Sequence, residues 1–196
     1  MNFDDFKALY IFSCICLGLI TITPILSLLI RFPSGERFSE IWILGSDHRA
    51  EDYPFNIVRN DTYTVYVGVC NHMGESMYYV VYVKFRNQTE PLPNVTKETP
   101  SSLPAIYEYR FVISDGEVWE TKVTFSFDFD NASLVKSITV DNRTITVNKY
   151  GLWDSENKGY YYQLFFELWI YNLDEEDFCF HNRFVGIWLN MSNAVR

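Results

Sequence analysis

The strongest hydrophobic pattern is a run of apolar side chains near the N-terminus. Residues 8–30, ALYIFSCICLGLITITPILSLLI, carry no charge over 23 positions. A helix of this length reaches about 34 Å at 1.5 Å per residue, whereas the hydrocarbon core of a bilayer is about 30 Å thick. Its many Leu, Ile and Phe side chains favour insertion. The pattern therefore predicts one uncleaved transmembrane anchor at 8–30, preceded by a stub at 1–7 and followed by a juxtamembrane linker at 31–45.

A cleaved signal peptide is the alternative for the same segment. Signal peptides have a shorter apolar run of 7 to 15 residues and a cleavage site of small residues. This run is longer and ends in Leu-Leu-Ile-Arg-Phe-Pro, which favours the anchor. Basic residues do not decide its orientation, because Lys7 precedes the run while Arg31 and Arg37 follow it.

Acceptor sites for N-glycosylation favour one orientation. Asn-x-Ser/Thr sequences arise by chance in β-turns, but here all of them follow the apolar run. The candidate acceptors are Asn60, Asn87, Asn94, Asn131, Asn142 and Asn190. Glycosylation is a modification of exported surfaces. We therefore expect the stub to be cytoplasmic, residues 46–196 to form a domain outside the cytoplasm, and the protein to lie in the cell membrane as a single-pass chain.

From residue 62 onward the pattern changes to the period of two that is typical of β-strands. Residues 62–70, TYTVYVGVC, alternate in this way, and a turn containing Gly74 leads to a second run at 77–86. The remaining strand candidates lie at 106–114, 118–127, 137–140, 144–147, 160–171 and 184–189. Many short strands separated by turns favour a mainly β fold, and we predict an immunoglobulin-like antiparallel β-sandwich.

Two segments of this domain have particular patterns. In 160–171 the even positions are all apolar and the odd positions include aromatic residues, which predicts a central strand buried on both faces. Residues 90–104, EPLPNVTKETPSSLP, have four prolines and no periodicity, which predicts an exposed, mobile loop. The many aromatic residues are typical of β-sheet cores, but an exposed Tyr and Trp ladder could also line a sugar-binding groove.

The net charge limits the classes of partner, and the cysteine positions limit the possible disulfides. The formal net charge is −9 at pH 7, which argues against nucleic acid as a partner because such proteins carry basic patches. Cys14 and Cys16 lie in the expected anchor, whereas Cys70 and Cys179 lie in the domain. An exported domain with two cysteines allows one disulfide, and two small buried thiols are the alternative.

Several segments resemble a known family. These are RFPSGERFSEIWILG after the apolar run, AEDYPFNI at 50–57, YTVYVGVCNHMG at 63–74, VYVKFRNQTEPLPN at 81–94 and the closing FVGIWLNMS. Together they resemble the C-terminal half of the archaeal membrane family catalogued as domain of unknown function number 1616. The resemblance implies the last helix of a multi-pass protein followed by an exported immunoglobulin-like β domain. It implies no catalytic residue.

Motifs for common enzyme classes are absent from the sequence: G-x-S-x-G, H-E-x-x-H, C-x-x-C, a phosphate-binding loop and a dinucleotide fingerprint. A polar cluster surrounds Asp47, His48, Glu51 and Asp52, and Asp47 and Asp52 could converge with His72 on a metal. Nothing in the sequence brings these residues together, so we expect a solvated turn and no metal or other cofactor. The acidic run at 174–177 predicts a hydrated turn that could meet a basic partner.

These observations predict a non-catalytic domain, not an enzyme, on a membrane anchor. The expected partners are the lipid bilayer, through residues 8–30, and another envelope or membrane protein to which the domain is an accessory subunit. The alternative is a glycan-binding or carbohydrate-active domain that uses exposed Tyr and Trp. Exposure of Trp153, Trp169 and Trp188 on one face would favour the alternative.

Overall fold

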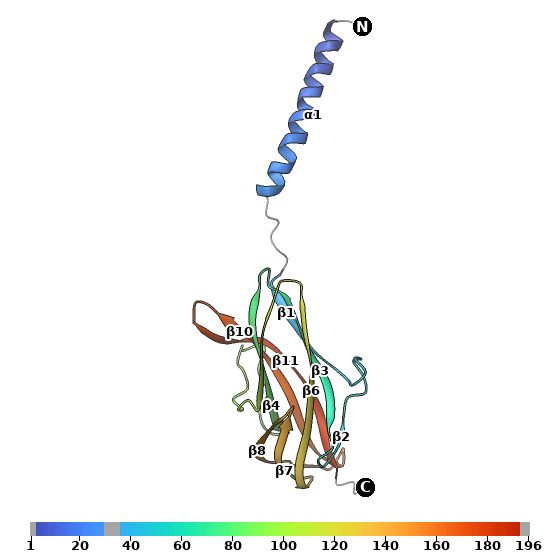
Figure 1. Ribbon diagram of the computed structural model, residues 1–196, viewed down its shortest axis with the longest axis vertical. Helices are drawn as coiled ribbons and strands as arrows, with labels where there is room; N and C mark the ends of the chain where they lie inside the picture. Colours follow the sequence, from blue (N-terminus) through green and yellow to red (C-terminus); the bar gives the residue numbers. More distant parts are fainter. Residues whose placement is uncertain (1–2, 30–35, 193–196) are drawn as a thin grey trace. The chain divides into compact units, whose positions relative to one another are not determined.

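The computed structural model describes residues 3–29 and 36–192, which form two units that we treat separately (Figure 1). The first is one helix, α1, Phe3–Leu29. No helix in the described part of the chain qualifies, by length and hydropathy, as a membrane span. The expected anchor at 8–30 falls partly outside this description, which omits residue 30 and the side chains of 8–9 and 23–29.

The second unit is a mainly β domain of two sheets. The first sheet has five strands in the order β1-β3-β6-β7-β8, all antiparallel. Its strands are β1 Phe38–Leu44, β3 Tyr63–His72, β6 Val118–Asn131, β7 Leu134–Val140 and β8 Arg143–Tyr150. The second sheet has the order β2-β11-β10-β4-β5, and a short strand, β9, also pairs with β10. Its strands are β2 Asn56–Val58, β4 Met77–Asn87, β5 Tyr107–Ile113, β9 Trp153–Asp154, β10 Gly159–Asn172 and β11 Asp177–Ser192.

All the strands predicted from the period of two are present, and most extend a few residues further than predicted. Three strands were missed, because β2 and β9 are very short and β1 lies inside the stretch 31–45 that we predicted as linker. The linker prediction was therefore too long. In β1, Ser39 and Ile43 are buried while Phe38 and Glu40 are exposed, so the alternation was present but short.

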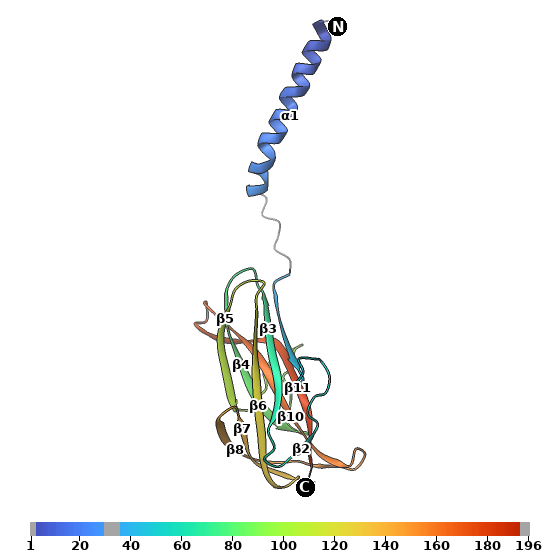
Figure 2. The ribbon, with the colours of Figure 1, turned by 45° about the vertical axis from the view of Figure 1, so that its right-hand side comes forward.

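The two sheets share one core. Inward-facing side chains from both form a single buried cluster that includes Val67 and Phe125 from the first sheet and Tyr79 and Phe166 from the second. Figures 1 and 2 show strands of both sheets running lengthwise, so that β1 begins at one end of the domain and β11 finishes at the other. Alternating apolar positions on long strands produce this arrangement, because each sheet buries its apolar face against the other.

The immunoglobulin-like class is not confirmed. One sheet of an immunoglobulin domain has the strand order A-B-E-D, in which the outermost strand, D, comes before its neighbour E in the chain. Here β6 lies beside β3, and the strands outward of it, β7 and β8, come later in the chain. The mainly β class with antiparallel sheets was predicted correctly, although the short strand β2 pairs with β11 in parallel.

The prediction that β10 is central is confirmed, because it lies between β11 and β4. Its inner face buries Leu164 and Phe166, and Phe165 and Glu167 on its outer face are also fully buried. The chain at 88–105 contacts that outer face: the Ser101 N–H donates to the Glu167 carboxylate at 2.9 Å. Residues 90–104 are therefore not a wholly exposed loop, because Pro93 and Ser101 are buried.

Candidate functional site

An open groove of the domain lies between β1 and β11, where an edge of the first sheet meets a strand of the second. It has a volume of about 570 Å³ and is mainly apolar. Its lining comes from three segments, Ile41–Ile43, Tyr53–Phe55 and Val185–Trp188. A volume of this size is within the range of ligand-binding clefts, which is about 300 to 1,000 Å³.

The groove borders an incompletely paired strand. β2 is only three residues long and pairs with β11 at Asn190–Ser192. Among the described strands, none pairs with the earlier part of β11 on the side away from β10. The Asn190 N–H donates to the Phe55 carbonyl at 2.7 Å on that side. Because strand residues alternate in direction, Gly186 and Trp188 present their backbone groups to the same side as Asn190.

Aromatic side chains form the walls. Phe55 is 46% exposed and Trp188 is 42% exposed. The Tyr53 hydroxyl donates to the Ile43 carbonyl at 2.9 Å, which fixes that ring against β1. Trp42 lies across Gly68, where an added Cβ would meet the indole at 2.2 Å. Gly68 therefore gives Trp42 the space to lie flat on β3.

A second cleft adjoins the first and shares Phe55 and Trp188 with it. It has a volume of about 340 Å³ and adds Gln88, Asp154, Asn157 and Tyr161 to the lining. Hydrogen bonds from the side chain and backbone N–H of Asn157 lower the pKa of Asp154 below its ordinary value, so its carboxylate is charged at neutral pH. This cleft therefore combines aromatic faces with fixed polar groups.

The tryptophans that we proposed as indicators of glycan binding are divided. Trp153 and Trp188 are exposed, whereas Trp169 is half-buried against Tyr82, with ring centroids 5.4 Å apart. The Trp169 indole N–H also donates to Glu167 at 3.0 Å. Trp169 is therefore held in place by neighbouring side chains, whereas Trp188 lines both clefts.

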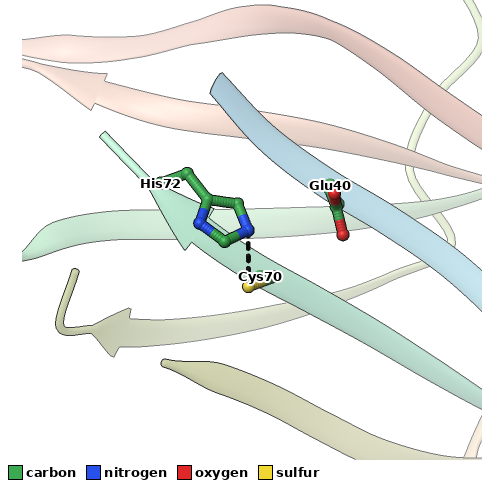
Figure 3. A group of neighbouring side chains, drawn as sticks. All are labelled: Glu40, Cys70 and His72. Carbon is green, nitrogen blue, oxygen red and sulfur yellow. Dashed lines mark hydrogen bonds between the residues drawn. The ribbon is translucent and has the colours of Figure 1, made fainter. Parts of the chain in front are cut away.

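A second group of chemically reactive side chains lies on the outer face of the first sheet. Glu40 of β1 is directly opposite Cys70 of β3, and His72 is two residues further along the same strand. Figure 3 shows the three side chains together, with the Cys70 thiol 3.1 Å from His72 Nε2. Burial raises the pKa of the Cys70 thiol, and the nearby Glu40 carboxylate raises it further. The thiol is therefore protonated at neutral pH.

The two domain cysteines do not form the disulfide that the sequence allowed. Both are free thiols. Cys70 belongs to the first sheet, whereas Cys179 belongs to β11 of the second. The Cys179 thiol donates to the Glu175 carboxylate at 3.2 Å, and this hydrogen bond raises the pKa of Cys179.

The polar cluster at 47–52 does not assemble the metal site that we considered. His48 pairs with Glu120 at 3.1 Å and stacks on Tyr66, with ring centroids 3.6 Å apart. Within the described residues, the ligand-type side chains that come together in a group of three are Glu40, Cys70 and His72. The sequence analysis named His72 and Cys70 but did not group them, and it missed Glu40 because β1 was not predicted. The acidic run at 174–177 is exposed: it lies in the turn between β10 and β11 and ends at Asp177, the first residue of β11.

A buried polar chain connects the two sheets. His181 Nε2 lies 3.1 Å from the Ser39 hydroxyl, which lies 2.7 Å from the Tyr79 hydroxyl. Tyr79 donates to the Asn71 side-chain oxygen at 2.9 Å. The pKa of His181 is lowered, mainly because the imidazole is buried. Ser39 is 1% exposed, so the chain satisfies buried polar groups and does not present a hydroxyl to a substrate.

The candidate glycosylation sites differ in their surroundings. Asn87 and Asn190 are partly buried, and their side-chain amides donate to the Tyr150 carbonyl and to Asn56, respectively. The exposed acceptors are Asn60, Asn94, Asn131 and Asn142. Because N-glycosylation modifies the side-chain nitrogen, the exposed group offers the more accessible acceptors.

The solved structures to which the chain is similar have low sequence identity and TM-scores below 0.5. The chain is similar to β-glucosidase from Listeria innocua, with 7% identity and a TM-score of 0.44 over 82% of this chain and 17% of the other. The glucose complex of that enzyme gives 9% identity and a TM-score of 0.41, over 83% and 17%. The chain thus spans 17% of the length of these glucosidase chains.

A chain from the human seminal plasma complex of zinc 2-glycoprotein and prolactin inducible protein is also similar. Its identity is 10% and its TM-score is 0.38, over 82% of this chain and 99% of that one. No curated protein sequence matches the chain.

One family model matches. It describes a domain of unknown function, DUF1616, and covers residues 33–135. The match begins just before β1 and extends into β7, so it includes the Glu40, Cys70 and His72 cluster and the β1 side of the groove. Because the match covers more than half of the 196 residues, this chain belongs to the DUF1616 family.

Proposed function

We propose that the β domain is a non-catalytic contact module, and that it binds an extended segment of another envelope or membrane protein in the groove between β1 and β11. The observation that carries this proposal is the incompletely paired edge of β11 beside an apolar groove. An extended peptide can pair its backbone with such an edge while its side chains enter neighbouring pockets. The pairing of Asn190 with Phe55 is an example of such backbone pairing on the same edge.

The edge of β11 offers backbone groups to such a segment. Gly186, which has no side chain, and Trp188 present theirs to the groove. A peptide that paired with them would rise about 3.3 Å per residue and extend toward Phe184. Trp42, Tyr53 and Phe55 supply apolar contacts. Aromatic residues of this kind contribute most of the binding energy in many protein interfaces.

We also propose that the chain is anchored in the cell membrane by residues 8–30, with the β domain outside the cytoplasm. The support is the sequence of this segment, which has no charged residue over 23 positions. As a helix it would reach about 34 Å, enough to cross a hydrocarbon core of about 30 Å. Protease added to intact cells should remove the β domain, and complete protection would contradict this orientation.

The groove is tested by comparing two exposed tryptophans in the full chain. We expect Trp188→Ala to abolish co-purification of a specific partner from detergent-solubilised native membranes, whereas Trp153→Ala keeps it. Cross-linking from position 188 should identify one extended segment of that partner. Equal capture by both variants, or cross-links that all lie outside the groove, would contradict the proposal.

A glycan ligand is the second candidate, favoured by the cleft that Phe55 and Trp188 share with Asp154 and Asn157. Sugar rings stack on aromatic faces and bond to fixed polar groups, and this cleft offers both. Titrating envelope oligosaccharides against the intrinsic fluorescence of the full chain tests this candidate. Saturable quenching that disappears in Trp188→Ala would favour the glycan, and hydrolysis of a glycoside panel would contradict a non-catalytic role.

A further inference from the structure

The Glu40, Cys70 and His72 cluster offers a sulfur, a nitrogen and an oxygen donor in one place. The donor atoms lie within 4.8 Å of one another. Zinc sites combine cysteine, histidine and carboxylate ligands, and sites with three protein ligands keep a fourth position for water. We propose that these three residues form a binding site for a divalent transition metal ion of the zinc class.

The strand register creates the arrangement. Cys70 and His72 are two residues apart in β3, so their side chains share a face of the sheet. Glu40 is the cross-strand neighbour of Cys70 in β1, and side chains opposite each other in antiparallel strands lie close together. Three ligands are thus presented by two paired backbones, which is a rigid support for a metal site.

The distances fit an ion after small side-chain rotations. Zinc bonds of about 2.3 Å to sulfur and about 2.0 to 2.2 Å to nitrogen or oxygen place tetrahedral ligand atoms about 3.3 to 3.6 Å apart. The present Sγ to Nε2 distance is 3.1 Å, so the ligands must open slightly. Binding would release the thiol proton to solvent and replace the Cys70 to His72 hydrogen bond with two metal bonds.

The surroundings support binding from solvent. The Phe38 ring packs on the His72 imidazole, with centroids 4.7 Å apart, and so restrains its orientation. Cys70 is 7% exposed, whereas Glu40 is exposed. Sulfur is therefore shielded while the carboxylate side stays open to water and an incoming ion.

A second Cys-x-His sequence in the chain provides an internal comparison. Cys179 and His181 have the same spacing in β11. There, however, the thiol donates to Glu175 and the imidazole contacts Ser39 instead. The spacing alone does not make a site. At Cys70 the imidazole of His72 contacts the thiol beside the carboxylate of Glu40, whereas the imidazole of His181 contacts Ser39 instead of Cys179.

The metal would join β1 to β3. β1 is the first strand of the domain and lies at an edge of its sheet, so among the described strands it pairs with β3 alone. An ion bound to the folded state alone stabilises it by mass action. At about a hundredfold excess over the dissociation constant, a domain of this size should gain about 5 to 10 °C in Tm.

Cobalt(II) is the probe for the test, because its bond to a thiolate gives a charge-transfer absorption band. The full chain, stripped with chelator, is titrated with Co²⁺ and then with Zn²⁺. We expect a band that saturates at one ion per chain and that Zn²⁺ removes. Cys70→Ser should lose it, and His72→Gln and Glu40→Gln should weaken binding by about tenfold or more. The matched controls Cys179→Ser and Glu117→Gln should titrate as the wild type does.

Zinc should also raise the Tm of the wild type and of both controls, but not that of Cys70→Ser. Because Glu40 is exposed, Glu40→Gln should leave the fold intact and so separates loss of metal binding from misfolding. Circular dichroism of each metal-free variant checks its fold. Absence of a thiolate band in the wild type would overturn the proposal. A band that persists in Cys70→Ser, or that disappears in Cys179→Ser, would also overturn it.

Discussion

A buried ion pair on the outer face of the second sheet gives the sharpest stability prediction. Glu167 is fully buried, and its carboxylate lies 2.8 Å from the ammonium of Lys84. The Ser101 N–H and the Trp169 indole also donate to Glu167, at 2.9 and 3.0 Å. Lys84 in turn donates to the Ser101 carbonyl at 2.7 Å. The pair therefore fixes the chain at 88–105 over the sheet as well as joining β4 to β10.

The perturbation is Lys84→Met, which keeps an unbranched apolar chain and removes the cation. It leaves the Glu167 carboxylate buried without its counter-charge and the Ser101 carbonyl without its donor. Breaking a buried pair from one side costs about 3 to 5 kcal/mol. Glu167→Gln removes the other charge and should cost a similar amount. The double variant should cost clearly less than the sum, because it leaves no unpaired buried charge.

The assay is urea denaturation of the full chain, followed by tryptophan fluorescence, together with limited proteolysis. Lys84→Met should lower the free energy of unfolding by the stated amount and increase cleavage between residues 90 and 104. Lys97→Met is the matched control, because Lys97 is an exposed lysine in the same segment, and it should change little. The reasoning is refuted if Lys84→Met costs less than about 1 kcal/mol or if the single variants add in the double variant.

Three further predictions follow from the surroundings of individual residues. Gly68→Val places side-chain atoms where the Trp42 ring lies, so it should cost about 1 to 3 kcal/mol in a denaturation experiment and shift the Trp fluorescence. Burial lowers the pKa of His181, so the unfolded state takes up its proton first; stability should fall as pH drops below about 6.5, and His181→Gln should show a smaller loss between pH 7 and 5. Peptide mapping after expression in a glycosylating host should find no glycan on Asn87 or Asn190 and should find it on the exposed acceptors Asn60, Asn94, Asn131 and Asn142.

The local sequence pattern was sufficient to predict a strand wherever one face of that strand packs against the core. The alternation at 62–70 and 160–171 predicted β3 and β10, because burial of one face requires apolar residues at every second position. β1 was missed because it has only seven residues and follows a segment rich in turn-forming residues. That omission concealed Glu40, the carboxylate that lies opposite Cys70 beside His72.

The candidate sites depend on contacts that no local pattern contains. Trp188 and Phe55 are far apart in the chain and meet because β2 pairs with the end of β11. Lys84 lies on β4 and Glu167 on β10, where they form a buried ion pair. Taken singly, a charged residue type predicts a solvent-exposed side chain. Because these arrangements require strand pairing between distant segments, register decides them, and register is a property of the assembled sheet.

The sequence by itself determined the apolar N-terminal segment, the mainly β class, the hairpin strands and the central place of β10, because each depends on local periodicity and burial. The tertiary structure alone decided the order of the strands, the free state of Cys70 and Cys179, the groove beside β11 and the grouping of Glu40 with Cys70 and His72. The physical reason is distance along the chain. Side chains that are far apart in the sequence come together only when the register of the sheets is set and the two sheets close on a common core.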